Sequence, residues 1–320
     1  MLRLARRSEQ TIDLYRKVLL SYSRFLEVPL EKVHKHLLPE NLIKYAASRR
    51  DKSERGTQLH LSILNRYFEI NGVTFNPLER NVIKSRQTPD NHDKPLEPHT
   101  LQKMMDLADR HMRAVLTTLI STGMRAGECS QLLLSDLDGD TITIRPETAK
   151  RRLGGKVYLT TEAQQYMRLW LEYRDEYIHQ ADRRSVGLGV RGKEDKRLFA
   201  CHYQTLRRKF AHLYDLVDGE QGKYHARCTL HSTRKYFRTH AVRSMPLDLV
   251  EKIMRHQGYL TSSYVRISDE DARRMFHAGE SSLFITQVGE LKKELDEVKI
   301  TQERRIAAME KIIARLDGKG

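Results

Sequence analysis

The 320-residue sequence has little of what marks a secreted or membrane-embedded protein. It holds three cysteines, Cys129, Cys201 and Cys228, and their wide spacing implies no disulfide framework. No apolar run reaches the roughly 18 residues that a membrane-spanning helix requires. The basic N-terminal stretch MLRLARRSEQ lacks the apolar core of a signal peptide. We therefore expect a cytoplasmic protein.

Negative charge is also in short supply. The chain has 42 acidic residues against 57 lysines and arginines, which gives a net charge of +15. Residues 1–90 and residues 91–282 each carry +7, whereas residues 283–320 carry only +1. A basic excess of this size favours a polyanionic partner, although a merely basic soluble protein is the alternative. Two basic regions suit a protein that holds DNA between two domains.

Apolar periodicity and proline divide the chain into four parts. Residues 1–86 repeat amphipathic helical patterns, which predict a compact helical domain with lysine and arginine along its solvent faces. Three of the eight prolines, at positions 89, 95 and 98, predict a linker over 87–99. Residues 100–282 are mostly helical in pattern, with two alternating runs at 140–145 and 156–160 that predict a hairpin or small antiparallel sheet. The expected fold is thus mainly α with one small β element.

The fourth part, residues 283–320, carries an apolar seam with a helical period. Its members recur three or four residues apart, with one polar residue near the middle: Phe284, Val288, Leu291, Leu295, Val298, Gln302, Ile306, Met309, Ile313 and Leu316. This spacing predicts a C-terminal helix. Two interpretations remain open, a self-associating coiled coil and a single helix lying on the protein's own surface.

Two short motifs suggest cofactors but lack the context that a cofactor needs. GLGVRG at 187–192 matches a dinucleotide-binding pattern, yet no apolar strand precedes it and no helix follows it. HARCTLH places His225, Cys228 and His231 three residues apart, but no fourth ligand is evident nearby. We expect neither a nucleotide nor a metal.

Two other motifs place cationic side chains where phosphate could bind. TGMRAGE puts Arg125 at a helix N-terminus, where backbone N–H groups also favour anions, and Glu128 one turn later could pair with Arg125 or with a backbone N–H. LHSTRKYFRTH puts His231 and Arg234 on one face of a helix. A guanidinium offers a fork of donors to two phosphate oxygens. Each motif alone also fits an ordinary surface residue.

Taken in chain order, the motifs form a pattern that resembles the tyrosine recombinase, or phage integrase, family. That family has an arginine in a TGxRxxE segment, a lysine on a β-hairpin, an HxxR pair, a further histidine or tryptophan, and a nucleophilic tyrosine. The matching segments here are TGMRAGE, ETAKRRLGGKVYLT, LHSTRKYFRTH, IMRHQGYL and SSYVRIS. The matching catalytic residues are Arg125, Lys150, His231, Arg234, His256 and Tyr264.

The resemblance implies a two-domain architecture, in which residues 1–86 form a helical core-binding domain that contacts DNA and residues 100–282 form a mixed α/β catalytic domain. It implies the chemistry as well. Tyr264 would attack a phosphodiester and form a covalent 3′-phosphotyrosyl DNA, without a metal or nucleotide cofactor. Arg125 and Arg234 would hold the non-bridging oxygens. Lys150, or Lys156 on the same hairpin, would protonate the departing 5′ oxygen.

The remaining residues of the pattern would assist the attack of Tyr264 and the binding of the phosphate. His231 would help to accept the tyrosine proton, and His256 would hydrogen-bond the phosphate. Arg151, Arg152 and Lys156 flank the hairpin tip and are expected to contact phosphate. A second tyrosine, Tyr259, is interpreted as a packing residue.

Three features depart from the pattern. Tyr264 follows His256 by eight residues, one fewer than in many members, which resembles integrases of archaeal mobile elements. Arg255 stands where the family often has glycine, and the tail beyond residue 283 is long.

The expected function is therefore site-specific DNA recombination. Its partners would be double-stranded DNA and further copies of the chain, assembled as a tetramer on the DNA. A catalytically silent DNA-binding regulator and a type IB topoisomerase are the alternatives.

Overall fold

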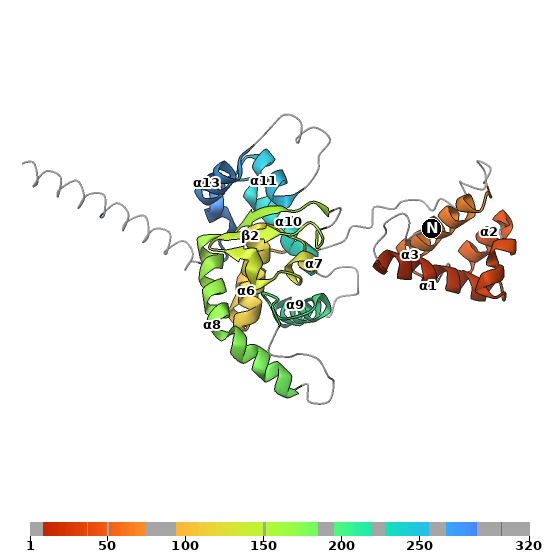
Figure 1. Cartoon of the computed structure of the whole chain (residues 1–320), viewed down its shortest axis with the longest axis horizontal. Coiled ribbons are helices and arrows are strands. Elements are labelled where there is room, and N and C mark those ends of the chain that lie inside the picture. The colour runs from red at the N-terminus through yellow and green to blue at the C-terminus, as the bar shows by residue number, and fades with distance from the viewer. Residues whose placement is uncertain are drawn as a thin grey trace, which may run out of the picture. The chain divides into compact units, whose positions relative to one another are not determined.

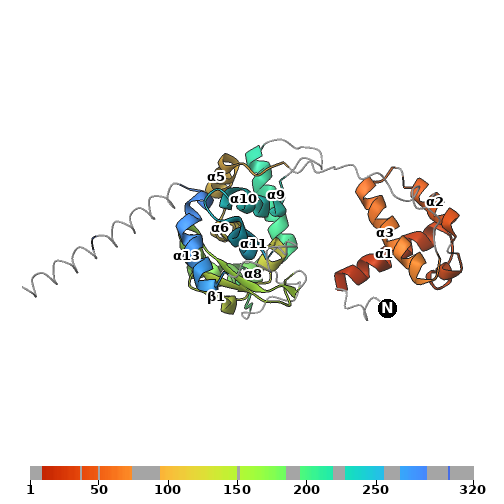
Figure 2. The same cartoon turned by 90° about the horizontal axis from the view of Figure 1, so that it is seen from above.

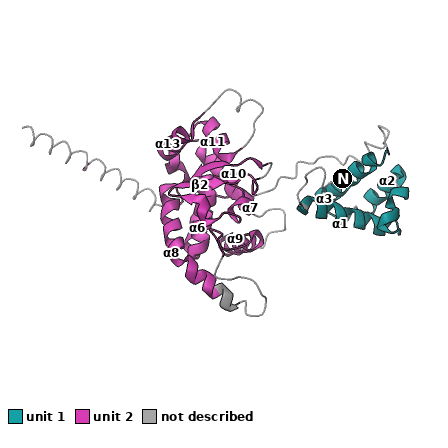
Figure 3. Ribbon diagram, in the orientation of Figure 1, with its two compact units in different colours: residues 1–90 teal, residues 91–320 magenta. Residues whose placement is uncertain are grey.

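The computed structural model describes residues 9–36, 38–49, 51–73, 94–149, 152–184, 195–218, 228–255 and 267–286, together with Gln302. The chain folds as two compact units, Met1–Asp90 and Asn91–Gly320 (Figure 3). Within the described ranges, no helix is both long and apolar enough to cross a membrane. The seam predicted for the C-terminal helix lies outside these ranges, apart from Phe284 and Gln302, and stays a prediction.

The described part of the first unit is helical. It consists of α1 (Glu9–Phe25), the 3-10 helix η1 (Leu30–His36), α2 (Pro39–Ala47) and α3 (Glu54–Ile70). Ser53 caps α3 by accepting a hydrogen bond from the backbone N–H of Gly56 at 3.2 Å. Tyr22, Tyr45 and Phe68 are buried at the centre, and the rings of Tyr22 and Tyr45 meet edge to face at 5.1 Å. The amphipathic stripes seen in the sequence thus bury a core that is rich in aromatic rings.

The second unit gathers its helices around α6, as Figure 2 shows. Nearly every residue of α6 is buried, and α6 packs against α8 and α10. The helices in chain order are α5 (Pro98–Leu107), α6 (Arg110–Thr122), α7 (Ala126–Cys129), η2 (Leu134–Asp136), α8 (Thr161–Arg184), α9 (Tyr203–Asp218), α10 (Leu230–Ala241), α11 (Leu247–Met254), α13 (Asp269–Gly279) and η4 (Glu280–Leu283) (Figure 1).

The second unit begins before the predicted end of the linker. Leu96 is buried in its core, and Pro98 is the first residue of α5. A proline fits the first turn of a helix because no carbonyl there needs its missing N–H. Pro98, which the sequence assigned to the linker, therefore starts a helix of the second unit.

The β element is a three-stranded antiparallel sheet in the order β1 (Leu137–Asp138), β2 (Thr141–Ile144) and β3 (Gly155–Tyr158). Ile142 pairs with Val157, and both side chains are buried. The prediction of a mainly helical chain with one small sheet is confirmed. The alternating runs correspond to β2 and β3, whereas β1 spans two residues and is too short for its pattern to be seen.

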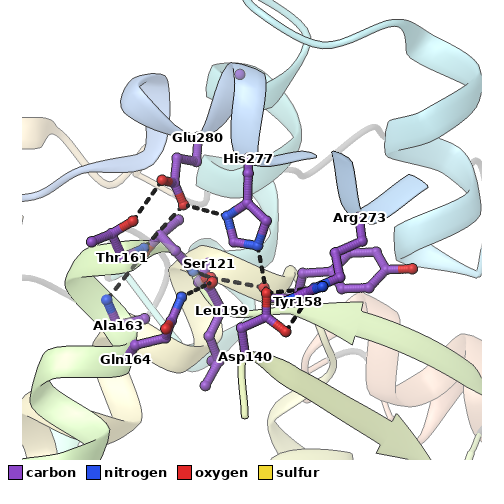
Figure 4. A network of polar contacts seen from close by, with 12 residues as sticks. Ser121, Asp140, Tyr158, Leu159, Thr161, Ala163, Gln164, Arg273, His277 and Glu280 are labelled. Atoms are coloured by element: carbon purple, nitrogen blue, oxygen red, sulfur yellow. Dashed lines mark hydrogen bonds and ion pairs between the residues drawn. The ribbon is translucent and has the colours of Figure 1, made fainter. Parts of the chain in front are cut away.

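A polar network joins α13 to this sheet and to the start of α8 (Figure 4). His277 lies between two carboxylates, with Nε2 at 2.6 Å from Asp140 and Nδ1 at 3.1 Å from Glu280. Glu280 also accepts hydrogen bonds from the backbone N–H of Thr161 at 3.0 Å and from its hydroxyl at 2.7 Å. Arg273 donates to Asp140 at 2.7 Å. The chain that follows residue 266 is therefore attached to the sheet at a defined place.

Candidate active site

Arg125 is positioned by a sharp turn at the end of α6. Gly123 ends that helix with φ of 57°, and a Cβ at this position would lie 2.3 Å from the ring of Phe237. Glycine is required both by the backbone and by the packing. Two residues later, Arg125 caps the start of α7, as its place in TGMRAGE predicted.

Glu128 holds Arg125 by two contacts. Its carboxylate accepts from the backbone N–H of Arg125 at 3.0 Å and from Nη1 of the same residue at 3.2 Å. The side chain of Glu128 is only 3% exposed, whereas that of Arg125 is 31% exposed. The buried carboxylate thus holds the Arg125 guanidinium in place and leaves part of that guanidinium open to solvent.

The HxxR motif begins α10. Thr229 caps this helix and accepts a hydrogen bond from the backbone N–H of His231 at 3.2 Å. His231 is exposed on the first turn, while Arg234, one turn later, is buried. Arg234 donates to the carbonyls of Gly123 at 2.6 Å and Met254 at 2.8 Å. It thereby ties together the turn before Arg125 and the end of α11.

Burial and neighbouring charge act together on Arg234. Burial, followed by the positive charge of Arg125, lowers the pKa of Arg234 to about 10. The guanidinium still carries its charge at neutral pH. Arg234 also donates to the carbonyl of Gly123, two residues before Arg125, so the two arginines predicted to bind one phosphate lie near each other.

A third arginine, Arg255, belongs to the same cluster. It follows α11 directly, and its guanidinium forms an ion pair with Glu128 through Nη2. The sequence marked Arg255 only as a departure from the family pattern and missed its place in the site. The feature of the sequence that could have indicated this role is that Arg255 directly precedes His256, a predicted catalytic residue.

The cluster carries a net positive charge. Three guanidiniums, those of Arg125, Arg234 and Arg255, lie around the carboxylate of Glu128. A second carboxylate that acts on Arg234, that of Glu251, is paired with Arg238. Buried like charges are costly unless an anion neutralises them. The arrangement therefore favours an oxyanion such as a phosphodiester over a neutral or cationic ligand.

The hairpin residues near the predicted tip are on the surface. Arg152 is exposed and has φ of 56°, and Lys156 on β3 is half-exposed. Lys156 lies 3.7 Å from the carboxylate of Asp269, at the start of α13. Lys156 therefore connects the hairpin to the helix that follows the predicted nucleophile.

The structure describes only part of the predicted site. Lys150, Arg151, His256, Tyr259 and Tyr264 lie outside the described residues, so their roles stay predictions. His225 does too, whereas Cys228 is buried and donates to the carbonyl of Lys94 at 3.1 Å. In the part of the chain that the structure describes, no group of three or more histidine, cysteine or acidic residues could hold a metal ion.

The chain is similar to known proteins in family and in fold. A family model described as "Phage integrase family" matches residues 94–271. A search of curated proteins found no match. The chain is similar in structure to the Tn1549 transposon integrase in complex with transposon right end DNA, with TM-score 0.56 and 16% identity over 85% of this chain and 95% of that one.

Phage lambda integrase gives similar values. Its dimer bound to a COC′ core site has TM-score 0.53 and 13% identity, covering 84% of this chain and 95% of that one. Its tetramer bound to a Holliday junction has TM-score 0.55 and 12% identity, covering 83% and 77%. At such low identity, these likenesses show a shared fold.

Proposed function

Because the chain belongs to the phage integrase family, we propose that it is a site-specific DNA recombinase that works through a covalent 3′-phosphotyrosyl intermediate at Tyr264. The observation that carries the proposal is the partly buried cluster in which Glu128 holds Arg125 near Arg234. Two guanidiniums placed in advance can stabilise the charge that develops on the non-bridging oxygens of a phosphodiester. They supply the electrostatic stabilisation that a metal ion supplies in other phosphoryl-transfer sites.

Among the described residues, Arg234 would bind the phosphate and His231 would take part in proton transfer. Arg234 is fixed by two backbone carbonyls, so it presents its remaining N–H groups with little loss of side-chain entropy on binding. His231, exposed on the first turn of α10, is accessible to a substrate and can help to accept the proton of the nucleophile.

The remaining roles are assigned by the family pattern. The hydroxyl of Tyr264, whose ordinary pKa is about 10, must lose its proton to attack. Lys150 protonates the departing 5′ oxygen, and His256 hydrogen-bonds the phosphate. No bond energy is lost in this scheme, because the phosphotyrosyl link keeps it for rejoining.

The proposed partners are double-stranded DNA and other copies of the chain. The net charge of +15 and the exposed Arg152 and Lys156 suit contacts with the DNA backbone, and Arg151 would add to them. Exchange between two sites requires several protomers, so we propose assembly into a tetramer on DNA. The C-terminal helix would contribute to this self-association.

The covalent intermediate provides the test. A binding site is first selected from a random-sequence duplex library, and nicked duplexes with that sequence are then incubated with the full chain. After denaturation and digestion, mass spectrometry should find a nucleotide on the peptide that contains Tyr264. Tyr264→Phe should abolish the adduct, and Tyr259→Phe, the matched control, should retain it.

Other outcomes would point to different functions. An adduct on Tyr259 would contradict the assignment of the nucleophile. Tight, salt-sensitive binding without any adduct would favour a DNA-binding regulator. Relaxation of any supercoiled plasmid by a monomer would favour a topoisomerase.

A further inference from the structure

Arg255 occupies a backbone conformation that usually belongs to glycine. It caps the end of α11 with φ of 52° and ψ of 45°, in the left-handed region. Helices often end in this conformation, and glycine is preferred there because a Cβ introduces strain. An arginine at this position suggests that its side chain makes contacts that offset the strain.

Those contacts lie in the active site. The side chain of Arg255 is only 4% exposed and pairs with Glu128, a residue 127 positions away in the sequence. Its Nε and Nη1 atoms are buried and have no hydrogen-bond partner among the described residues. Unpaired buried donors lower stability. The guanidinium is therefore poorly explained as a purely stabilising group.

Glu128 is shared between two arginines. One of its carboxylate oxygens accepts from the backbone N–H of Arg125 and pairs with Arg255, and the other accepts from Nη1 of Arg125. With Arg125 alone, the carboxylate would be held from one side. Arg255 adds a further contact to Oε2, which restricts the orientations of the carboxylate and so those of the Arg125 guanidinium on Oε1.

Arg255 also adjusts the charge of the cluster. Without it, Glu128 would neutralise one of the two arginines expected to bind phosphate. With it, two positive charges remain in excess around the carboxylate, as a phosphodiester site requires.

The same side chain lies against the second strand of the hairpin. A Cβ on Gly155, the first residue of β3, would lie 3.4 Å from Cδ of Arg255. The stem of the arginine thus packs on the strand that follows the predicted hairpin tip.

We propose that Arg255 is a positioning residue of the active site, which holds Glu128 and thereby orients Arg125 toward the scissile phosphate. This inference rests on the proposed function and assigns a role to a residue outside the six of the family pattern. A lysine would keep the charge but not the planar fork, so it should not replace the arginine fully.

The test uses three variants of the full chain, Arg255→Gly, Arg255→Lys and Glu128→Gln, with the nicked duplex selected above. The rate of covalent complex formation, the affinity for DNA and the thermal unfolding midpoint are measured for each. We expect Arg255→Gly to lower the cleavage rate about 10²-fold, as a misplaced catalytic group does. DNA affinity should change by less than about threefold, because phosphate contacts across the whole interface dominate it.

A double-mutant cycle separates positioning from general destabilisation. If Arg255 acts through Glu128, Arg255→Gly should lower cleavage far less in the Glu128→Gln background than in the wild type. Millimolar guanidinium chloride should partly restore cleavage by Arg255→Gly but not by Arg255→Lys, whose side chain fills the space. Arg274→Gln breaks an exposed ion pair with Asp271 within α13, away from Glu128 and the three arginines, and should leave cleavage unchanged.

The possible failures are distinguishable. A wild-type chain that forms no adduct would overturn the proposed function. If the wild type forms the adduct and Arg255→Gly forms it equally fast, the role of Arg255 is overturned and the proposed function stands. Independent effects of Arg255→Gly and Glu128→Gln on the cleavage rate would have the same meaning.

Discussion

Arg234 and Glu128 show how single residues prepare this site for an anion. Arg234 is 6% exposed, and two backbone carbonyls accept from its guanidinium. These carbonyls accept hydrogen bonds from part of the guanidinium but carry no net charge. A carboxylate in their place would cancel the positive charge of Arg234. Glu128 lies against Arg125 and Arg255 instead. The charge on Arg234 therefore remains available to a substrate.

Arg234→Lys should damage both cleavage and stability. A lysine has no planar fork, so it cannot reach the carbonyls of Gly123 and Met254 together. We expect cleavage to fall about 10²–10³-fold and the free energy of unfolding to fall by about 1–3 kcal/mol. Single-turnover cleavage and urea unfolding measure the two effects. Arg243→Lys, an exposed change just beyond α10, is the control, and equal behaviour of the two variants would contradict the prediction.

Gly123→Ala should destabilise the second unit. The added Cβ would lie 2.3 Å from the ring of Phe237, and the backbone has φ of 57°. We expect a loss of about 1–3 kcal/mol from overpacking, in addition to about 1 kcal/mol of backbone strain. Gly139→Ala is the matched control, because Gly139 has φ of 58° but open space around it. If the two variants unfold at the same urea concentration, the clash with Phe237 is not significant.

At the scale of elements, α13 depends on polar contacts to hold its place. Burial by itself lowers the pKa of His277, but its hydrogen bonds to Glu280 and Asp140 outweigh this effect, so the pKa is raised. Arg273 contributes to the same network, and its hydrogen bond helps to lower the pKa of the Asp140 carboxyl. Protonated His277 donates to both carboxylates and links α13, the sheet and α8 (Figure 4).

This network predicts a pH dependence of stability. Since the pKa of His277 is higher in the folded chain than its ordinary value of about 6.5, its stabilisation is complete below that value. The stabilisation is lost as pH rises through the folded pKa. Thermal unfolding between pH 6 and about 9 should show a midpoint that falls with pH in the wild type.

His277→Gln is the variant that tests the cause. It removes the titrating group, so the fall in midpoint over this range should become smaller than in the wild type. Asp140 does not contribute to the change in midpoint over this range, because its lowered pKa means that it titrates at acid pH. An equal fall in both proteins would show that another group titrates.

At the scale of the whole molecule, basic charge is distributed over both units. Residues 1–90 and 91–282 each carry +7. Lysine and arginine that contact phosphates release condensed counterions from DNA, so affinity depends steeply on salt. We expect both basic units to contact DNA, so the whole protein should behave as a strong polyelectrolyte binder.

DNA affinity should therefore fall about 10³–10⁵-fold between roughly 50 and 200 mM salt, as expected for six to ten phosphate contacts. Fluorescence anisotropy with a labelled duplex measures the slope. Arg152→Gln should reduce the slope of log K against log salt by about one, uniformly across sequences. A slope unchanged in Arg152→Gln would show that this exposed arginine does not contact the DNA.

The sequence by itself determined the features that depend on neighbours along the chain. The period of apolar residues predicted the helices, alternation predicted β2 and β3, and residue spacing placed Arg125 before α7 and His231 with Arg234 on α10. These properties are local, because a helix turn or a strand pleat is set by residues within a few positions.

Only the tertiary structure decided the contacts between distant residues. Arg255 reaches Glu128 across 127 positions, and His277 reaches Asp140 across 137, yet neither pair leaves a periodic signal. Burial and the neighbouring charge of Arg125 lower the pKa of Arg234, and no motif encodes either effect. Such contacts depend on how packed helices bring side chains together, because electrostatic interactions act through space and not along the chain.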